Sequence, residues 1–262
     1  MMEDNYKILF KLRYVLFLYL AFAIRDLIAS PLGLHDGTLE WAIYILITSI
    51  ILALISFIIS GTTKVTRTRI SFSMKSTMFF YALLMCFLGV LYLTGTLNDI
   101  IFLVQSGTYS IIIAAGVALG AGILEEFLIR VLMFAIILKF FENSKNKFLF
   151  TSVSTSFLFG LLHMHNLTEQ SMTTTVQQIF YTFVIGIVFS AVRIWFNGIT
   201  LAVFIHTLMD FKPTIVTGGT GSSNWMTVLI VFLPIAIFGV ICLIQLDKDS
   251  PNVSLVDNKL NF

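Results

Sequence analysis

Three ionisable residues lie close together in a stretch of the chain that is otherwise apolar. Glu125, Glu126 and Arg130 interrupt an uncharged run that extends from Gly107 to Leu138. A charge near the middle of a membrane helix costs roughly 2.5 to 3.5 kcal/mol, so these side chains need compensating partners. Two adjacent carboxylates in a poorly solvated place are expected to differ in their affinity for protons. Such a difference is expected of residues that carry out acid/base chemistry.

Helical spacing assigns different roles to the two carboxylates. Glu126 and Arg130 are four residues apart and share one helical face, with the acidic residue in the favourable N-terminal position. Glu125 lies about 100° around the helix from Glu126 and does not share the face of Arg130. We therefore infer that Glu126 and Arg130 form a structural pair, while Glu125 faces another part of the molecule.

Two later segments add polar side chains at the same spacing. Phe159 precedes His163 by four residues, and His206 precedes Asp210 by four residues in an otherwise apolar helix. An Asp paired with a His inside a bilayer predicts a functional site. His165 points nearly opposite to His163, and we interpret it as an interfacial or packing residue.

Together these side chains predict hydrolytic chemistry. Helical rise, counted from the expected cytoplasmic ends, places Glu125, His163 and Asp210 at similar depths. With His206 they provide a base for water, an imidazole to orient it and donors for an oxyanion. Glu125, His163 and His206 are also suitable ligands for zinc with an open position for water. The residues alone do not separate these two chemistries.

The composition of the chain predicts a polytopic membrane protein with an all-α fold. Of 262 residues, 58% are hydrophobic and only 11% are charged, which excludes an ordinary soluble domain. The net charge of +2 is too small to indicate a nucleic-acid partner. The expected partners are the lipid bilayer and a membrane-associated peptide or protein.

Hydropathy predicts a bundle of about eight transmembrane helices in a single domain, residues 1–246, followed by a short polar cytoplasmic tail, residues 247–262. The expected spans are 13–30, 41–60, 78–97, 108–141, 148–165, 173–195, 198–212 and 225–246. Lys and Arg alternate between the loops in a pattern that places both termini in the cytoplasm.

The fourth expected span is too long for one simple crossing. At 1.5 Å per residue it would extend about 50 Å, against a hydrocarbon core of roughly 30 Å. It must therefore tilt, protrude or break. Gly116, Gly120 and Gly122 mark the expected irregularity, and such small residues also let a neighbouring helix come close.

The polar motifs resemble those of the CPBP or Abi family, which contains CAAX-processing intramembrane proteases and bacteriocin-processing or bacteriocin-immunity proteins. The resemblance covers about residues 108–212, and it implies that the second glutamate and the arginine support the site. The matching motifs are Glu125-Glu126-Phe-Leu-Ile-Arg130, Phe159-Gly-Leu-Leu-His163 and His206-Thr-Leu-Met-Asp210.

The same resemblance implies roles for the other motif residues. Glu125 would activate water together with His163, while His206 and Asp210 would stabilise the oxyanion. CAAX-processing members commonly have Asn at the last position, and Asp210 can donate a hydrogen bond only when it is protonated. The family is often described as metalloprotease. We favour a metal-free glutamate mechanism that requires no cofactor, with zinc as the alternative.

These observations favour an intramembrane endopeptidase that cleaves a membrane-associated peptide or protein. A bacteriocin-immunity or scaffold protein of the same fold, which acts by binding, is the main alternative, and intact motifs favour the enzyme. A proton-coupled transporter is less consistent with the sequence because no repeat symmetry is evident. A small chain rich in Ile, Phe, Lys and Asn suggests a multi-pass protein of a bacterial plasma membrane.

Overall fold

The computed structural model describes residues 2–217 and 221–256, with the side chains from Phe10 onwards except those of residues 26 and 30. Within these residues the regular elements are helices. They are α1 (Met2–Ala29), η1 (Ser30–Leu32), α2 (Leu39–Ser60), α3 (Met74–Leu93), α4 (Thr96–Gln105), α5 (Thr108–Glu125), η2 (Glu126–Met133), α6 (Phe134–Phe140), α7 (Lys147–Leu162), η3 (His163–Thr168), α8 (Met172–Phe196), α9 (Thr200–Asp210), α10 (Thr214–Thr217) and α11 (Trp225–Asp249).

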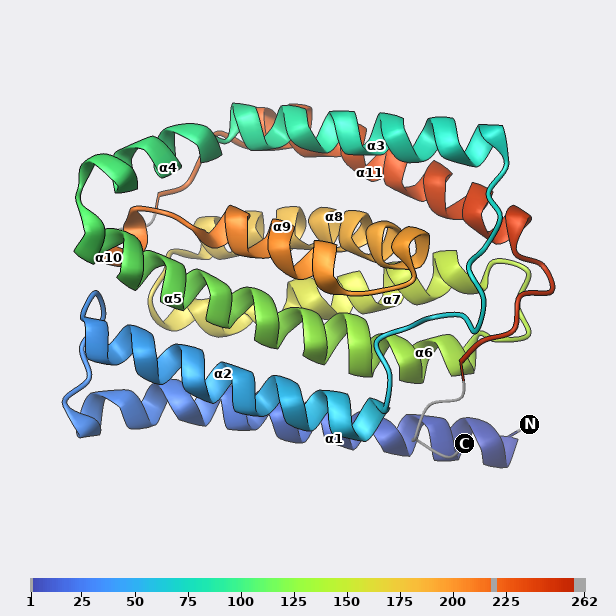
Figure 1. Cartoon of the computed structure of the whole chain (residues 1–262), viewed down its shortest axis with the longest axis horizontal. Coiled ribbons are helices and arrows are strands. Elements are labelled where there is room, and N and C mark those ends of the chain that lie inside the picture. The colour runs from blue at the N-terminus through green and yellow to red at the C-terminus, as the bar shows by residue number, and fades with distance from the viewer. Residues whose placement is uncertain (1, 218–220, 257–262) are drawn as a thin grey trace.

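The long helices run back and forth along one common direction, so that α1 begins and α11 ends at the same end of the bundle (Figure 1). α2 packs along α5, α7 along α8, α3 along α11, and α9 along α5. α8 is the central helix, because every residue from Val184 to Ile194 is buried. The expected all-α membrane bundle is therefore confirmed.

Five helical segments are long and apolar enough to cross a membrane, namely α2, α3, α7 with η3, α8 and α11. α9 is shorter than the expected span 198–212, since its 11 residues extend only about 16 Å against roughly 30 Å of hydrocarbon. α4 lies in a segment where the sequence predicted a connection. The number of complete crossings, eight, thus stays a prediction.

Residues from Thr108 to Phe140 form one continuous helical run, as the long fourth span predicted. Its irregularity is a π-helical segment, η2, which begins at Glu126, one residue after α5 ends. The expectation that the glycines mark the irregularity is wrong, because Gly116, Gly120 and Gly122 all lie within regular α5. π-helical turns inside α-helices frequently mark functional sites.

The glycines of α5 instead allow close packing, as their size predicted. A Cβ on Gly116 would lie 3.5 Å from Ala42 Cβ of α2, and one on Gly120 would lie 3.3 Å from Ile45 Cγ2. At Gly122 it would lie only 2.5 Å from Thr207 Oγ1 of α9. The absence of side chains here lets α5 lie against two helices, of which α9 carries two of the motif residues.

The chain after Leu246 packs against the bundle, which differs from the expectation of a polar tail. α11 continues to Asp249, and Asp247 is buried where it accepts backbone hydrogen bonds from Phe148 (2.8 Å) and Leu149 (2.9 Å). These bonds satisfy amides at the beginning of α7 that have no helical partner. Residues 257–262 of the expected tail lie outside the described part.

Candidate functional site

The buried core of the site is the ion pair between Glu126 and Arg130, at the beginning of η2. Arg130 Nη1 lies 3.5 Å from Glu126 Oε1, and both side chains are fully buried. The structural pair predicted from helical spacing is therefore confirmed. The Arg130 guanidinium also lies over the ring of Phe159, with Cζ 4.3 Å from its centroid, which adds a cation–π contact.

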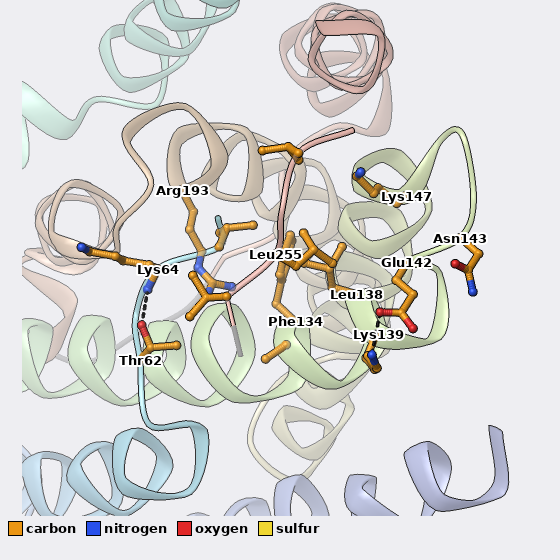
Figure 2. A pocket seen from close by; sticks show the side chains of 14 residues that line it. Thr62, Lys64, Phe134, Leu138, Lys139, Glu142, Asn143, Lys147, Arg193 and Leu255 are labelled. Carbon is orange, nitrogen blue, oxygen red and sulfur yellow. Dashed lines mark hydrogen bonds and ion pairs between the residues drawn. The ribbon is translucent and has the colours of Figure 1, made fainter. Parts of the chain in front are cut away.

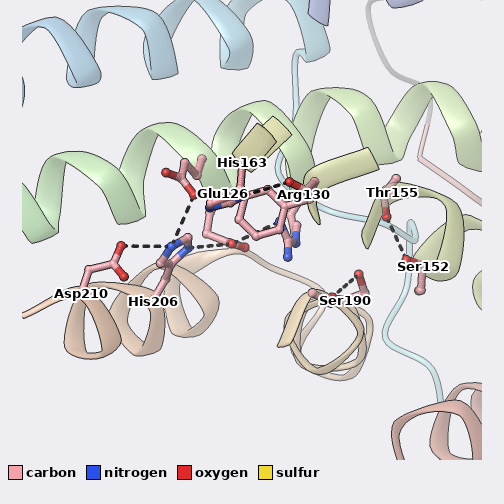
Figure 3. Close-up of polar contacts among 11 residues, drawn as sticks. Glu126, Arg130, Ser152, Thr155, His163, Ser190, His206 and Asp210 are labelled. Atoms are coloured by element: carbon pink, nitrogen blue, oxygen red, sulfur yellow. Dashed lines mark hydrogen bonds and ion pairs between the residues drawn. The ribbon is translucent and has the colours of Figure 1, made fainter. Parts of the chain in front are cut away.

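Glu126 also contacts a histidine on another helix. His206 Nδ1 donates a hydrogen bond to Glu126 Oε1 at 3.0 Å, and its Nε2 lies 3.3 Å from Asp210 Oδ2 and 3.6 Å from Glu125 Oε2 (Figure 3). Carboxylates only accept hydrogen bonds, so both ring nitrogens donate to them in the imidazolium form. The positive charge of the His206 ring is therefore balanced by the carboxylates around it.

His163 lies where α7 ends and η3 begins. Its Nδ1 donates a hydrogen bond to the backbone oxygen of Phe159 at 3.1 Å. The other nitrogen, Nε2, then carries a lone pair and can accept a proton. The Phe159 ring fixes the histidine further through an edge contact, with ring centroids 5.1 Å apart. Phe159 therefore positions His163 through both its carbonyl group and its ring.

A cavity of about 230 Å³ brings the motif residues of three helices together. Glu125, His163, His206 and Asp210 all line it, which supports the inference that they lie at compatible depths. A smaller cavity of about 30 Å³ is bordered by both Glu125 and His163. That volume exceeds the roughly 10 to 15 Å³ that one water molecule needs. The arrangement can therefore hold a water molecule between a carboxylate and an imidazole.

Two of the side chains that would bind zinc, those of Glu125 and His206, are already engaged with one another. Zinc would require free donor atoms on Glu125, His163 and His206, but both nitrogens of His206 already face carboxylate oxygens. Within residues 2–217 and 221–256, no group of three or more His, Cys, Asp or Glu side chains is arranged to hold a metal ion. The side chains in this arrangement do not fit a zinc ion.

Several cavity residues were not predicted from the sequence. Phe189 of α8 stacks obliquely on His206, with ring centroids 5.3 Å apart, and Lys212 lines the cavity beyond the end of α9. Tyr19 of α1 donates a hydrogen bond to the Leu162 carbonyl group at 2.9 Å and borders the smaller cavity. These residues belong to no spaced polar motif, and an aromatic residue in a membrane helix carries no distinguishing signal.

His165 was interpreted as an interfacial or packing residue, and its surroundings agree with that interpretation. It is exposed, and its Nδ1 donates to the Leu162 carbonyl group at 2.8 Å. Its ring packs edge-on against Phe22, with centroids 5.9 Å apart. The side chain lines both cavities, but it takes part in none of the ion pairs of the polar network.

Part of the chain matches a known protein family. Residues 107–212 match the model of the Rce1-like type II CAAX prenyl endopeptidases, a protease family. These are nearly the residues over which the motifs resemble the CPBP or Abi family, and that resemblance is confirmed. No curated protein and no solved structure matches the chain.

Proposed function

Residues 107–212 are similar to the type II CAAX prenyl endopeptidases, and on this premise we propose that the chain is an intramembrane endopeptidase. It hydrolyses a peptide bond in a membrane-associated peptide or protein. The single observation that carries the proposal is the cavity that Glu125 and His163 share with His206 and Asp210. A carboxylate, two imidazoles and a second carboxyl group in one cavity supply the parts of a hydrolytic site.

In this proposal Glu125 is the general base. Its side chain is 24% exposed and borders both cavities, whereas the neighbouring Glu126 is fully buried and already paired. A water in the small cavity loses its proton to the Glu125 carboxylate, while the Nε2 lone pair of His163 holds the water in place by accepting its other hydrogen. The hydroxide formed in this way attacks the substrate carbonyl carbon. The C–N bond of the resulting tetrahedral intermediate then breaks as Glu125 gives its proton to the leaving amine nitrogen.

His206 stabilises the negative charge that develops on the substrate oxygen. Its Nε2–H group lies in the cavity, and the substrate oxygen takes the place of a weaker contact, the 3.6 Å approach to Glu125. Glu126 is a positioning residue, because it holds Nδ1 of the ring and is itself held by Arg130. Asp210 lies 3.3 Å from Nε2, and its carboxylate stabilises the positive charge of the imidazolium ring.

The substrate enters a cavity that is lined by both polar and apolar side chains. Tyr181, Ile185 and Met209 form apolar parts of its walls. Beyond the motif residues, the polar lining includes Asn166, Gln178, Thr182 and Lys212. The apolar side chains suit the hydrophobic side chains of a membrane-associated peptide, and the polar groups suit its backbone. No cofactor is required, since Glu125 and His163 activate the water without a metal.

The proposed location is a bacterial plasma membrane, with both termini in the cytoplasm. The end of the bundle at which α1 begins and α11 ends also carries the connection between α2 and α3, with its Lys64, Arg67 and Arg69 (Figure 1). The connection between α6 and α7 adds Lys145 at that end. Positively charged connections mark the cytoplasmic side of a membrane protein.

The test uses the full chain purified in detergent and a set of synthetic membrane-associated peptides, both leader-bearing precursors and prenylated C-terminal peptides. Mass spectrometry should find new peptide termini with the wild-type protein and with Glu169→Gln, which alters an exposed acidic residue outside both cavities. His163→Gln should reduce cleavage about 100-fold or more. The chelator EDTA should leave cleavage unchanged.

A wild-type protein that melts cooperatively but cuts no peptide in the set would overturn the proposal. In that case the immunity or scaffold function, which needs binding alone, would replace it. Loss of cleavage on addition of EDTA, with recovery on addition of zinc, would retain the protease and reject the metal-free mechanism.

A further inference from the structure

A second and larger cavity, of about 490 Å³, lies at the end of the bundle where α1 begins. Its walls come from the connection after α2, from α6, from α8 and from the chain after α11 (Figure 2). None of its lining residues lines the cavity that contains Glu125. The two cavities are therefore separate sites.

Arg193 of α8 is the central polar group of this second cavity. The residue is only 1% exposed, and its Nη2 donates one hydrogen bond, of 3.3 Å, to the Thr63 carbonyl group. Nε and Nη1 have no hydrogen-bond partner among the described residues. On one side the guanidinium faces the ring of Phe134, with Cζ 4.7 Å from its centroid.

A buried guanidinium with unused donors is costly and requires an explanation. Arg130, the other fully buried arginine, also has nitrogens without a hydrogen-bond partner, but its charge is paired with that of Glu126. No such carboxylate pairs with Arg193 in the part of the chain that the structure describes, and its side chain points into a cavity large enough for a ligand (Figure 2). A buried positive charge that faces a cavity and has no carboxylate partner among the described residues therefore indicates an anion from outside the chain.

The other charges of the cavity favour the same kind of ligand. Four basic side chains line it and only one acidic one, Glu142, which lies 2.7 Å from Lys139 Nζ. Lys147 donates to the Ser250 carbonyl group at 3.1 Å, and the exposed Lys64 stands at the rim. The excess of positive charge suits a phosphate, whose oxygens match the planar fork of an arginine.

We propose that this cavity binds the phosphate group of an anionic phospholipid, with Arg193 as the main ligand and Lys64 as a second. The cavity lies at the positively charged end of the bundle, which our topology places at the cytoplasmic leaflet, where anionic headgroups meet basic pockets between helices. A soluble phosphate compound would offer the same chemistry without the acyl chains. The proposal is independent of the endopeptidase function, because the two cavities share none of the described residues.

The experiment measures binding to the full-length protein in detergent by native mass spectrometry and by thermal shift. The probes are dioleoylphosphatidylglycerol, dioleoylphosphatidylcholine and inorganic phosphate. The wild type should bind the anionic lipid at least tenfold more tightly than phosphatidylcholine. Arg193→Gln should weaken this binding more than tenfold, and Lys64→Gln about fivefold, since each basic contact near the membrane contributes about that factor.

Lys75→Gln is the matched control, because Lys75 is an exposed lysine at the beginning of α3, after the connection that carries Lys64, and does not line the cavity. It should bind lipid as the wild type does. Lys64→Gln keeps the test valid if Arg193→Gln does not fold. Equal binding of both lipids, or equal effects of Lys64→Gln and Lys75→Gln, would overturn the proposal. Inorganic phosphate that binds as tightly as the anionic lipid would support the phosphate site and reject the lipid as its source.

Discussion

Replacing Gly122 by Ala should displace the helix that carries His206. The new Cβ would lie 2.5 Å from Thr207 Oγ1, 3.0 Å from Thr207 N and 3.2 Å from Val203 O, whereas ordinary contacts begin at 3.4 Å. The hydroxyl group can rotate away, but the two backbone atoms cannot. To reach 3.4 Å, α9 must move by 0.2 Å at Val203 O and by 0.4 Å at Thr207 N. If the Thr207 hydroxyl stays in place, the required movement is 0.9 Å.

Both stability and activity should respond to this movement. Overpacking costs about 1 to 3 kcal/mol, while replacement of Gly by Ala inside a helix returns about 1 kcal/mol, so we expect a net loss of roughly 0 to 2 kcal/mol. His206 directly precedes Thr207 in α9. When α9 moves away from α5, the contacts of His206 with Glu125 and Glu126 lengthen. Misplacement of this kind should lower kcat/KM by about 10- to 100-fold.

The assay compares Gly122→Ala with Gly89→Ala in peptide cleavage and in thermal melts. Gly89 lies in the middle of α3, and none of the described atoms lies within 4 Å of the Cβ that it would gain. That variant should be as active as the wild type and up to about 1 kcal/mol more stable. Adding Thr207→Ala to Gly122→Ala should recover part of the activity. If Gly122→Ala behaves as Gly89→Ala does, the argument that close packing of α5 and α9 sets the site geometry is refuted.

Two further predictions concern buried charges. Glu126→Gln should destabilise the protein by about 3 to 5 kcal/mol, because Arg130 loses its buried ion-pair partner. In thermal or denaturant unfolding, the double variant Glu126→Gln with Arg130→Gln should cost less than the sum of the two single changes. Additive effects would contradict the pairing. Asp247→Asn should cost about 1 to 2 kcal/mol, since one amide oxygen cannot replace two carboxylate oxygens on the Phe148 and Leu149 amides, and it should leave kcat/KM within about twofold. A large loss of activity would show that the end of α11 influences the catalytic cavity.

The parts of the site that sequence reasoning identified are those fixed by local geometry. Two pairs each lie within a single helix, namely Glu126 with Arg130 and His206 with Asp210. The four-residue spacing alone brings the side chains of each pair together. The expectation that the three motif helices share one site followed from the similar depths of Glu125, His163 and Asp210 along the membrane normal. The family resemblance added roles to these residues, which their spacing does not provide.

The features that were missed depend on how helices meet in space. The contact between Glu126 and His206 joins residues that are 80 positions apart, and no periodicity within either helix reports it. Likewise the buried state of Arg193 was not predicted, because an arginine at the end of a membrane helix usually extends to the interface. Where the helix changes to π geometry also depends on packing against its neighbours, so the glycines gave a misleading signal.

The role of Glu125 as general base is tested most directly by the kcat/KM of Glu125→Gln relative to the wild type. The measurement uses one cleaved peptide, EDTA in the buffer, and proteins shown by melting to be equally folded. Gln keeps the shape of the side chain but cannot take a proton, so we predict a fall of about 100- to 10,000-fold. A Glu125→Gln protein that retains activity within about threefold of the wild type would contradict the proposed mechanism.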